Sequence, residues 1–157
     1  MSEHMSEHMP EHTPEITAQE LATRVGAAMW ARDRAPQMLG MRLISIAPGA
    51  ACLDMPVRED MTNGHATCHG GLIFTLADTA FAYACNSGNH TTVASACHVD
   101  FLAPAQVGDI LRAEATERAT AGRSGVYDVT VTRQDGSIIA VFRGKSSRIK
   151  GDVLTGP

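Results

Sequence analysis

The feature that most constrains the fold is an apolar segment near the middle of the chain. Residues 72–85 read LIFTLADTAFAYAC and contain one charged residue, Asp78. The segment is too long for an ordinary strand and is rich in Ala and Leu, so it predicts a helix from about Gly70 to Asn86. Because this helix is apolar on nearly every side, it must be buried on most of them. We therefore expect one buried helix surrounded by other elements.

The rest of the chain is typical of a sheet that could surround this helix. Two short strand-like segments precede the helix, and four longer ones, rich in Val, Ile, Thr and Phe, follow it. The expected strands span 41–47, 50–57, 92–102, 109–119, 124–134 and 137–149. Asp135-Gly136 between the last two indicates a hairpin turn. The predicted fold class is α+β: an antiparallel sheet, ending in a meander of four strands, wrapped around one long central helix.

The N-terminal region divides into two parts. Residues 1–15 contain MSEH twice, are interrupted by prolines and carry no Lys or Arg, which predicts a disordered tail. Thr17 and Glu20 then form a capping-box pattern, and apolar residues follow at helical spacing, which predicts a helix over 17–34 outside the sheet. We expect residues 16–157 to form a single domain.

Charge and cysteine content exclude several classes of protein. The chain has 17 acidic and 13 basic residues, and four of the acidic ones lie in the tail, so the remainder balances at 13 against 13. Nucleic-acid binding requires a basic face and is not expected. No segment is apolar for long enough to span a membrane, and no apolar signal segment is visible. We therefore expect a cytoplasmic protein whose four cysteines are free thiols.

Asp78 is the first candidate functional residue. A lone carboxylate in an apolar helix is costly unless something compensates its burial. It could face a polar seam and form a structural pair. Alternatively, it could be a general base or nucleophile whose pKa is tuned by a dry pocket. We favour the functional interpretation, because the helix carries no other charge.

Gly70 and Gly71, at the predicted helix start, form a second signal. Glycine allows a ligand to approach the backbone, and the unpaired N–H groups at the positive end of a helix can stabilise an oxyanion. Gly70 and Asp78 are eight residues apart, which corresponds to about 12 Å along a helix. One reacting carbon cannot contact both residues of one chain. The spacing therefore predicts a homo-oligomer whose sites lie between subunits.

Two other groups of residues leave alternatives open. His65, Cys68 and His69 match no standard zinc spacing, so no metal is expected, and a Cys68–His pair lacks any local signature of a catalytic thiol. Near the C-terminus, four basic residues suggest either a solvated strand edge or a phosphate clamp for a nucleotide-bearing substrate, with equal weight. These are Arg143, Lys145, Arg148 and Lys150.

Three segments together resemble the hotdog-fold thioesterases, and most closely the phenylacetic acid degradation thioesterase group. They are NGHATCHGG at 63–71, LADTAFAYACNS at 76–87 and VDFLAPA at 99–105. The resemblance extends from about Met38 to Gly151. It implies a sheet wrapped around a central helix, and dimers that pair sheets edge to edge and often join into tetramers. It also implies an acyl-CoA substrate and no bound cofactor.

The resemblance assigns roles to four residues. Asp78 falls at the catalytic carboxylate, and Gly70 at the glycine whose N–H polarises the thioester carbonyl. Asn63 matches the asparagine that holds the carbonyl or the water, and His69 matches the histidine beside the thioester. In relatives, the carboxylate and the glycine of one site come from different subunits, in agreement with the helix spacing.

Substrate contacts are expected from residues on the helix start and the later strands, namely Gly71, Ser95, Arg143 and Lys145. The chain departs from the family pattern where some relatives place a Ser or Thr for the attacking water. The matching positions here are Ala82 and Ala94. Ser95 is adjacent but is expected to point to the other face of its strand.

These observations predict an acyl-CoA thioesterase that hydrolyses arylacetyl or hydroxylated arylacetyl thioesters in phenylacetate catabolism, as a dimer or homotetramer. One alternative is a hotdog dehydratase or hydratase, although such enzymes favour a His with an acid. The other is a non-catalytic acyl-CoA binding module, which an intact Asp78 argues against. Release of free thiol from a CoA ester separates the thioesterase from both alternatives.

Overall fold

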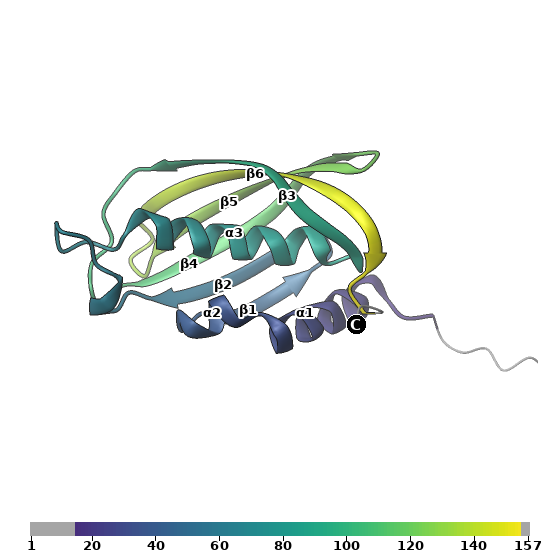
Figure 1. Cartoon of the computed structure of the whole chain (residues 1–157), viewed down its shortest axis with the longest axis horizontal. Helices are drawn as coiled ribbons and strands as arrows, with labels where there is room; N and C mark the ends of the chain where they lie inside the picture. Colours follow the sequence, from purple (N-terminus) through teal and green to yellow (C-terminus); the bar gives the residue numbers. More distant parts are fainter. Residues whose placement is uncertain (1–14, 155–157) are drawn as a thin grey trace, which may run out of the picture.

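The computed structural model describes residues 15–154, in which one antiparallel sheet curves around one long helix (Figure 1). The predicted α+β arrangement is confirmed. The six strands lie in the order β1-β2-β4-β5-β6-β3, and helix α3 packs against the concave face of the sheet. The elements are α1 Ala18–Arg32, α2 Arg34–Met38, β1 Arg42–Ala47, β2 Ala50–Pro56, the 3-10 turn Glu59–Met61, α3 Gly70–Asn86, β3 His90–Phe101, β4 Ile110–Ala121, β5 Ser124–Arg133 and β6 Ile138–Asp152.

The strand order differs from the predicted meander of four strands. The meander comprises β4, β5 and β6, whereas β3 pairs with β6 at the edge and β2 pairs with β4. Tight turns fix the β4–β5–β6 hairpins locally. Residues 102–109, which connect β3 to β4, form a longer crossing that leaves the partner of β3 to tertiary packing.

Phe81 fixes the position of α3 on the sheet. Its ring packs against the rings of Tyr127 and Phe142, with centroids 5.5 and 5.8 Å away. Gly144 of β6 lies beneath the ring, and an added Cβ there would come within 2.8 Å of it. The close approach of helix and sheet therefore requires glycine at this position, and it determines which side of α3 remains uncovered.

The two edges of the sheet differ. Helix α1 begins at the predicted capping box, in which Glu20 N–H donates to Thr17 Oγ1 at 3.1 Å, and packs beside β1. Gln19 of α1 donates to the Ile46 carbonyl at 2.8 Å, which partly satisfies that edge. At the other edge, β3 pairs with no described strand besides β6, and residues 93–98 are exposed. The sheet therefore has one open edge.

The predicted tail, the single domain and the cytoplasmic location concern the whole chain. Residues 1–14 of the predicted tail lie outside the described residues, and the single-domain assignment stays a prediction. In the part of the chain that is described, no helix is both long enough and apolar enough to cross a membrane. The cytoplasmic location stays a prediction.

Candidate active site

Asp78 lies in the middle of α3 on a partly exposed face. Five residues at spacings of three and four form this face, which we call the open stripe: Gly71, Thr75, Asp78, Ala82 and Cys85. The Asp78 side chain is half-buried, and this burial raises its pKa. Within residues 15–154, its carboxylate has no hydrogen bond or ion pair. The structural pair considered above thus finds no partner within these residues, and the carboxylate is free to accept a proton.

Two thiols lie close enough to Asp78 to sense its charge. Burial chiefly, and the charge of Asp78 in addition, raise the pKa of Cys85 to about 12 and also raise the pKa of Cys97. Burial likewise raises the pKa of Cys68. All three thiols are therefore protonated near neutral pH, which disfavours a thiolate nucleophile, including the Cys68–His pair considered above.

The first turn of α3 leaves the Gly70 N–H without an acceptor among the described residues. Gly71 N–H donates to His69 Nδ1 at 3.3 Å, and the N–H groups of Leu72 and Ile73 both donate to the His69 carbonyl. Gly70 is thus the position where the positive end of the helix can donate to a carbonyl oxygen or an oxyanion. The predicted substrate contact from Gly71 stays a prediction, and its N–H is already paired.

His69 caps the helix, and this hydrogen bond constrains its chemistry. Because Nδ1 accepts from Gly71 N–H, the proton of the neutral imidazole lies on Nε2. The ring is exposed. It can therefore donate from Nε2 to a bound carbonyl, whereas Nδ1 is occupied and unavailable as a base.

Asn63 organises the loop that leads into α3. Its Oδ1 accepts from His65 N–H at 2.9 Å, and from the N–H and hydroxyl of Thr67 at 3.3 and 3.2 Å. The backbone N–H of Asn63 donates to the Thr67 carbonyl at 2.8 Å. The Asn63 side-chain NH2 has no acceptor among the described residues. The loop therefore holds an amide donor at the same end of α3 as Gly70.

A cavity of about 340 Å³ opens beside Gly70, and Phe101 forms part of its wall. The ring of Phe101 lies against Gly70 so closely that an added Cβ would be 3.2 Å from it. Phe101 has no role that the sequence predicts, although VDFLAPA contributes to the resemblance. No local signal could have found this contact, because β3 returns to the start of α3 only in the folded sheet.

Neither position expected to hold the attacking water offers a hydroxyl. Ala82 lies on the open stripe one turn after Asp78, and Ala94 pairs with the buried Ser146. Ser95 sits in a β-bulge of β3, where its hydroxyl donates to the Lys145 carbonyl at 3.1 Å. Its predicted contact with substrate stays a prediction.

Arg143 and Lys145 lie on the outward face of β6. They alternate with the buried residues Phe142, Gly144 and Ser146, so the structure does not place them beside Asp78 of the same chain. Arg143 binds Asp128 through Nε and Nη2 at 2.6 and 2.9 Å. Lys145 has no carboxylate partner among residues 15–154. A phosphate would therefore find a free charge at Lys145 and a neutralised one at Arg143.

Metal ligands do not gather in the described part of the chain. Residues 15–154 contain no group of three His, Cys, Asp or Glu side chains placed to hold one ion. The arrangement instead offers a base, an unpaired backbone N–H and a side-chain amide donor. These are the groups needed to polarise a carbonyl and activate water against it.

The chain is similar to known proteins in sequence and in fold. Residues 65–140 match the thioesterase superfamily. The acyl-coenzyme A thioesterase PaaI of Escherichia coli is 48% identical over 126 residues, which cover 80% of this chain and 90% of that protein. The chain belongs to the PaaI-type thioesterases. Both the family and the hotdog fold expected from the sequence are thereby confirmed.

Solved PaaI structures share this fold. The E. coli PaaI structure, from the phenylacetic acid degradation operon, superposes with a TM-score of 0.85 at 46% identity, over 87% of this chain and 99% of that one. A mutant PaaI structure from Thermus thermophilus gives a TM-score of 0.72 at 35% identity, over 74% and 100%.

Proposed function

We propose that this PaaI-type thioesterase hydrolyses arylacetyl-CoA and hydroxylated arylacetyl-CoA to the free acid and CoA. One observation carries the proposal: among the described residues, α3 presents an unpaired carboxylate with a raised pKa, and an unpaired N–H at its N-terminus. The relation to PaaI supports the acyl-CoA substrate and the arylacetyl class. No metal or cofactor takes part in the proposed steps.

The geometry supports the following mechanism. Gly70 N–H, Asn63 NH2 and the helix dipole polarise the thioester carbonyl. Asp78 takes a proton from water, the water oxygen bonds to the carbonyl carbon, and the resulting oxyanion binds Gly70 N–H. The C–S bond then breaks, and the departing thiolate takes the proton from Asp78 to give CoA and restore the carboxylate. Alternatively, Asp78 attacks the carbon itself and the C–S bond breaks, which expels the CoA thiolate. Water then hydrolyses the mixed anhydride, restores the Asp78 carboxylate and supplies the proton that converts the thiolate to CoA.

The site requires two chains in this proposal. Gly70 and Asp78 lie eight residues apart on one straight helix, about 12 Å along its axis, so one carbonyl carbon reaches Gly70 of one subunit and Asp78 of another. The open edge at β3 supplies unpaired backbone groups through which two copies can join their sheets. Pairing of such dimers into tetramers stays a prediction.

The two alternative functions are separated by one assay. A dehydratase needs a histidine free to shuttle protons, whereas His69 Nδ1 is held by Gly71 N–H. A binding module needs no base, whereas Asp78 is present and has no partner among residues 15–154. We expect free thiol to appear from arylacetyl-CoA with kcat/KM at least about tenfold above that for short linear acyl-CoA, a typical effect of pocket contacts. Equal values would contradict the arylacetyl assignment, and no thiol from any ester would contradict the thioesterase proposal.

A phosphate contact from β6 predicts a larger rise in KM when Lys145 is replaced than when Arg143 is replaced. Lys145→Ala removes a cation that has no carboxylate partner in the described part of the chain, so KM for acyl-CoA should rise severalfold at low salt while kcat changes little. Arg143→Ala removes a cation already bound by Asp128 and should raise KM less. Steady-state kinetics at low and high ionic strength measure both effects. Unchanged KM in both variants would assign these residues to a solvated strand edge.

A further inference from the structure

Strand β3 runs alongside α3 in the opposite direction, and contacts join the two elements at both ends. At the start of the helix, the Phe101 ring lies against Gly70. At the end of the helix, Asn86 binds the backbone of Thr92 twice: Nδ2 donates to the carbonyl and Oδ1 accepts from the N–H, each at 2.9 Å. These two end contacts determine which residues of β3 lie level with each turn of α3.

Asp78 lies level with Cys97. Asp78 is midway along α3, about 12 Å of rise from the first end contact. Four residues of strand cover about 13 Å, which leads from Phe101 back to Cys97. The Cys97 side chain faces α3, because Cys97 pairs with Gly144, which lies beneath the Phe81 ring. The fold therefore brings one thiol beside the carboxylate.

The surroundings of the Cys97 thiol agree with this placement. Burial first, and the charge of Asp78 second, raise the pKa of Cys97, so the thiol keeps its proton near neutral pH. Within residues 15–154, the sulfur forms no hydrogen bond, and the side chain is exposed. A protonated thiol can donate one hydrogen bond. The thiol and the Asp78 carboxylate are thus both free to bind a third group between them.

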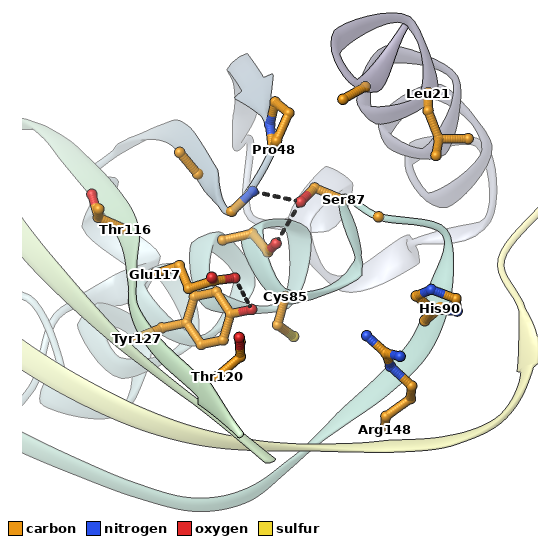
Figure 2. A pocket seen from close by; sticks show the side chains of 15 residues that line it. Leu21, Pro48, Cys85, Ser87, His90, Thr116, Glu117, Thr120, Tyr127 and Arg148 are labelled. Carbon is orange, nitrogen blue, oxygen red and sulfur yellow. Dashed lines mark hydrogen bonds between the residues drawn. The ribbon is translucent and has the colours of Figure 1, made fainter. Parts of the chain in front are cut away.

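Cys85, the other thiol near Asp78, lies farther along the helix. It is two turns beyond Asp78, about 10.5 Å of rise. Figure 2 shows it at a cavity of about 550 Å³ at the end of α3, which the hydrogen-bonded pair Glu117 and Tyr127 also lines. The Cys85 thiol donates to the Ala82 carbonyl at 3.5 Å. Cys85 therefore has a partner of its own and is not level with the carboxylate.

Water is the third group that hydrolysis requires beside Asp78. The two positions where a hydroxyl could hold this water are occupied by Ala82 and Ala94. We propose that the Cys97 thiol holds the attacking water beside Asp78 of the same chain. The inference rests on the proposed function and adds a catalytic residue to it.

The water is oriented by one donor and one acceptor. Its oxygen accepts from the Cys97 S–H and donates one proton to Asp78, which leaves a lone pair directed at the carbonyl carbon. As the oxygen bonds to the carbon, Asp78 takes the proton and the thiol keeps its own. If Asp78 attacks the carbon directly, the same water hydrolyses the mixed anhydride. Cys97 is neither nucleophile nor base in either route.

Cys97→Ala should lower kcat for arylacetyl-CoA about tenfold, the effect of one lost hydrogen bond to a reactant. KM should stay within about twofold, because the water acts in the chemical step. Cys97→Ser restores a donor of similar size and should keep kcat within about threefold of wild type. Cys52→Ala, on β2 where it pairs with Glu114 away from the helix, is the matched control and should change neither constant.

Three results would overturn the inference while leaving the hydrolysis intact. They are near-normal kcat in Cys97→Ala, equal losses of kcat in the alanine and serine variants, and a loss in alanine that accompanies a changed oligomeric mass. Circular dichroism and light scattering on each sample check the fold and the mass. Absence of thiol release from the wild type would instead contradict the thioesterase proposal.

Subunit mixing gives a readout that a purely structural role of Cys97 would not change. In the proposed site, Cys97 and Asp78 come from one chain and Gly70 from the other. When equal amounts mix at random, hybrids of Cys97→Ala with Gly70→Pro contain one intact site, and activity should recover to about one quarter of wild type. Hybrids of Cys97→Ala with Asp78→Asn contain no intact site and should stay below about one tenth. Equal recovery with both partners would overturn the inference.

Discussion

Replacing Asp78 by asparagine should lower kcat at least about 100-fold, the lower end of what a positioned general base contributes. Asparagine keeps the size of the side chain and removes its charge and basicity. Because no ion pair or hydrogen bond of the carboxylate is lost among the described residues, the variant should keep its fold and oligomeric state. The loss should appear in kcat, since the carboxylate acts mainly in the transition state. A folded variant with near-normal turnover would contradict the assignment.

The same variant tests the raised pKa of Asp78. Below the ordinary value of 3.8, both the folded and the unfolded wild-type protein carry protonated Asp78. As the pH rises through the interval between 3.8 and the raised folded value, the unfolded state loses its proton first, so the wild type loses stability. Asp78→Asn should therefore unfold at a higher temperature than wild type at neutral pH, with the difference vanishing in acid. Wild-type kcat should rise with pH along an acid limb whose midpoint lies above 3.8.

Replacing Gly70 by proline should lower kcat about 100- to 1000-fold, the usual effect of removing one oxyanion donor. Proline lacks the N–H but is well tolerated at the first position of a helix. His69 has φ −60° and ψ 129°, an extended conformation that is compatible with a following proline. The substitution thus removes the donor with little change to α3, and steady-state kinetics measure the result.

Gly70→Ala is the matched control for this experiment. Alanine adds the same Cβ beside the Phe101 ring, 3.2 Å away, but keeps the N–H. Phe101 is half exposed and can shift, so Gly70→Ala should retain kcat within about tenfold of wild type. If proline and alanine reduced kcat equally, the effect would come from crowding against Phe101, and the Gly70 N–H would have no role in the reaction.

Features with a local sequence signal could be predicted. The apolar run around Asp78 has one charge and strong helical propensity, so α3 and the isolation of its carboxylate follow from nearest-neighbour patterns. The capping box at Thr17 and the turn at Asp135-Gly136 are equally local. In each case, the interactions that decide the structure join residues a few positions apart.

Features that depend on strand order could not be predicted. β3 pairs with β6 across about 50 residues of chain, and this pairing places Phe101 against Gly70. The bond between Arg143 and Asp128 depends on the register of β5 and β6. The contact between Glu117 and Tyr127 similarly depends on a cross-strand pair beside a bulge. Sequence periodicity identifies the face of a strand but not its neighbour.

Mixing two inactive variants tests most directly whether hydrolysis uses Gly70 of one subunit and Asp78 of another. Asp78→Asn and Gly70→Pro proteins are each nearly inactive alone. After subunit exchange, half of randomly mixed dimers are hybrids with one intact site, so activity should recover to about one quarter of wild type. Exchange is verified with differently tagged subunits. Recovery near that level is the predicted result, and no recovery despite proven exchange would contradict a site shared between two chains.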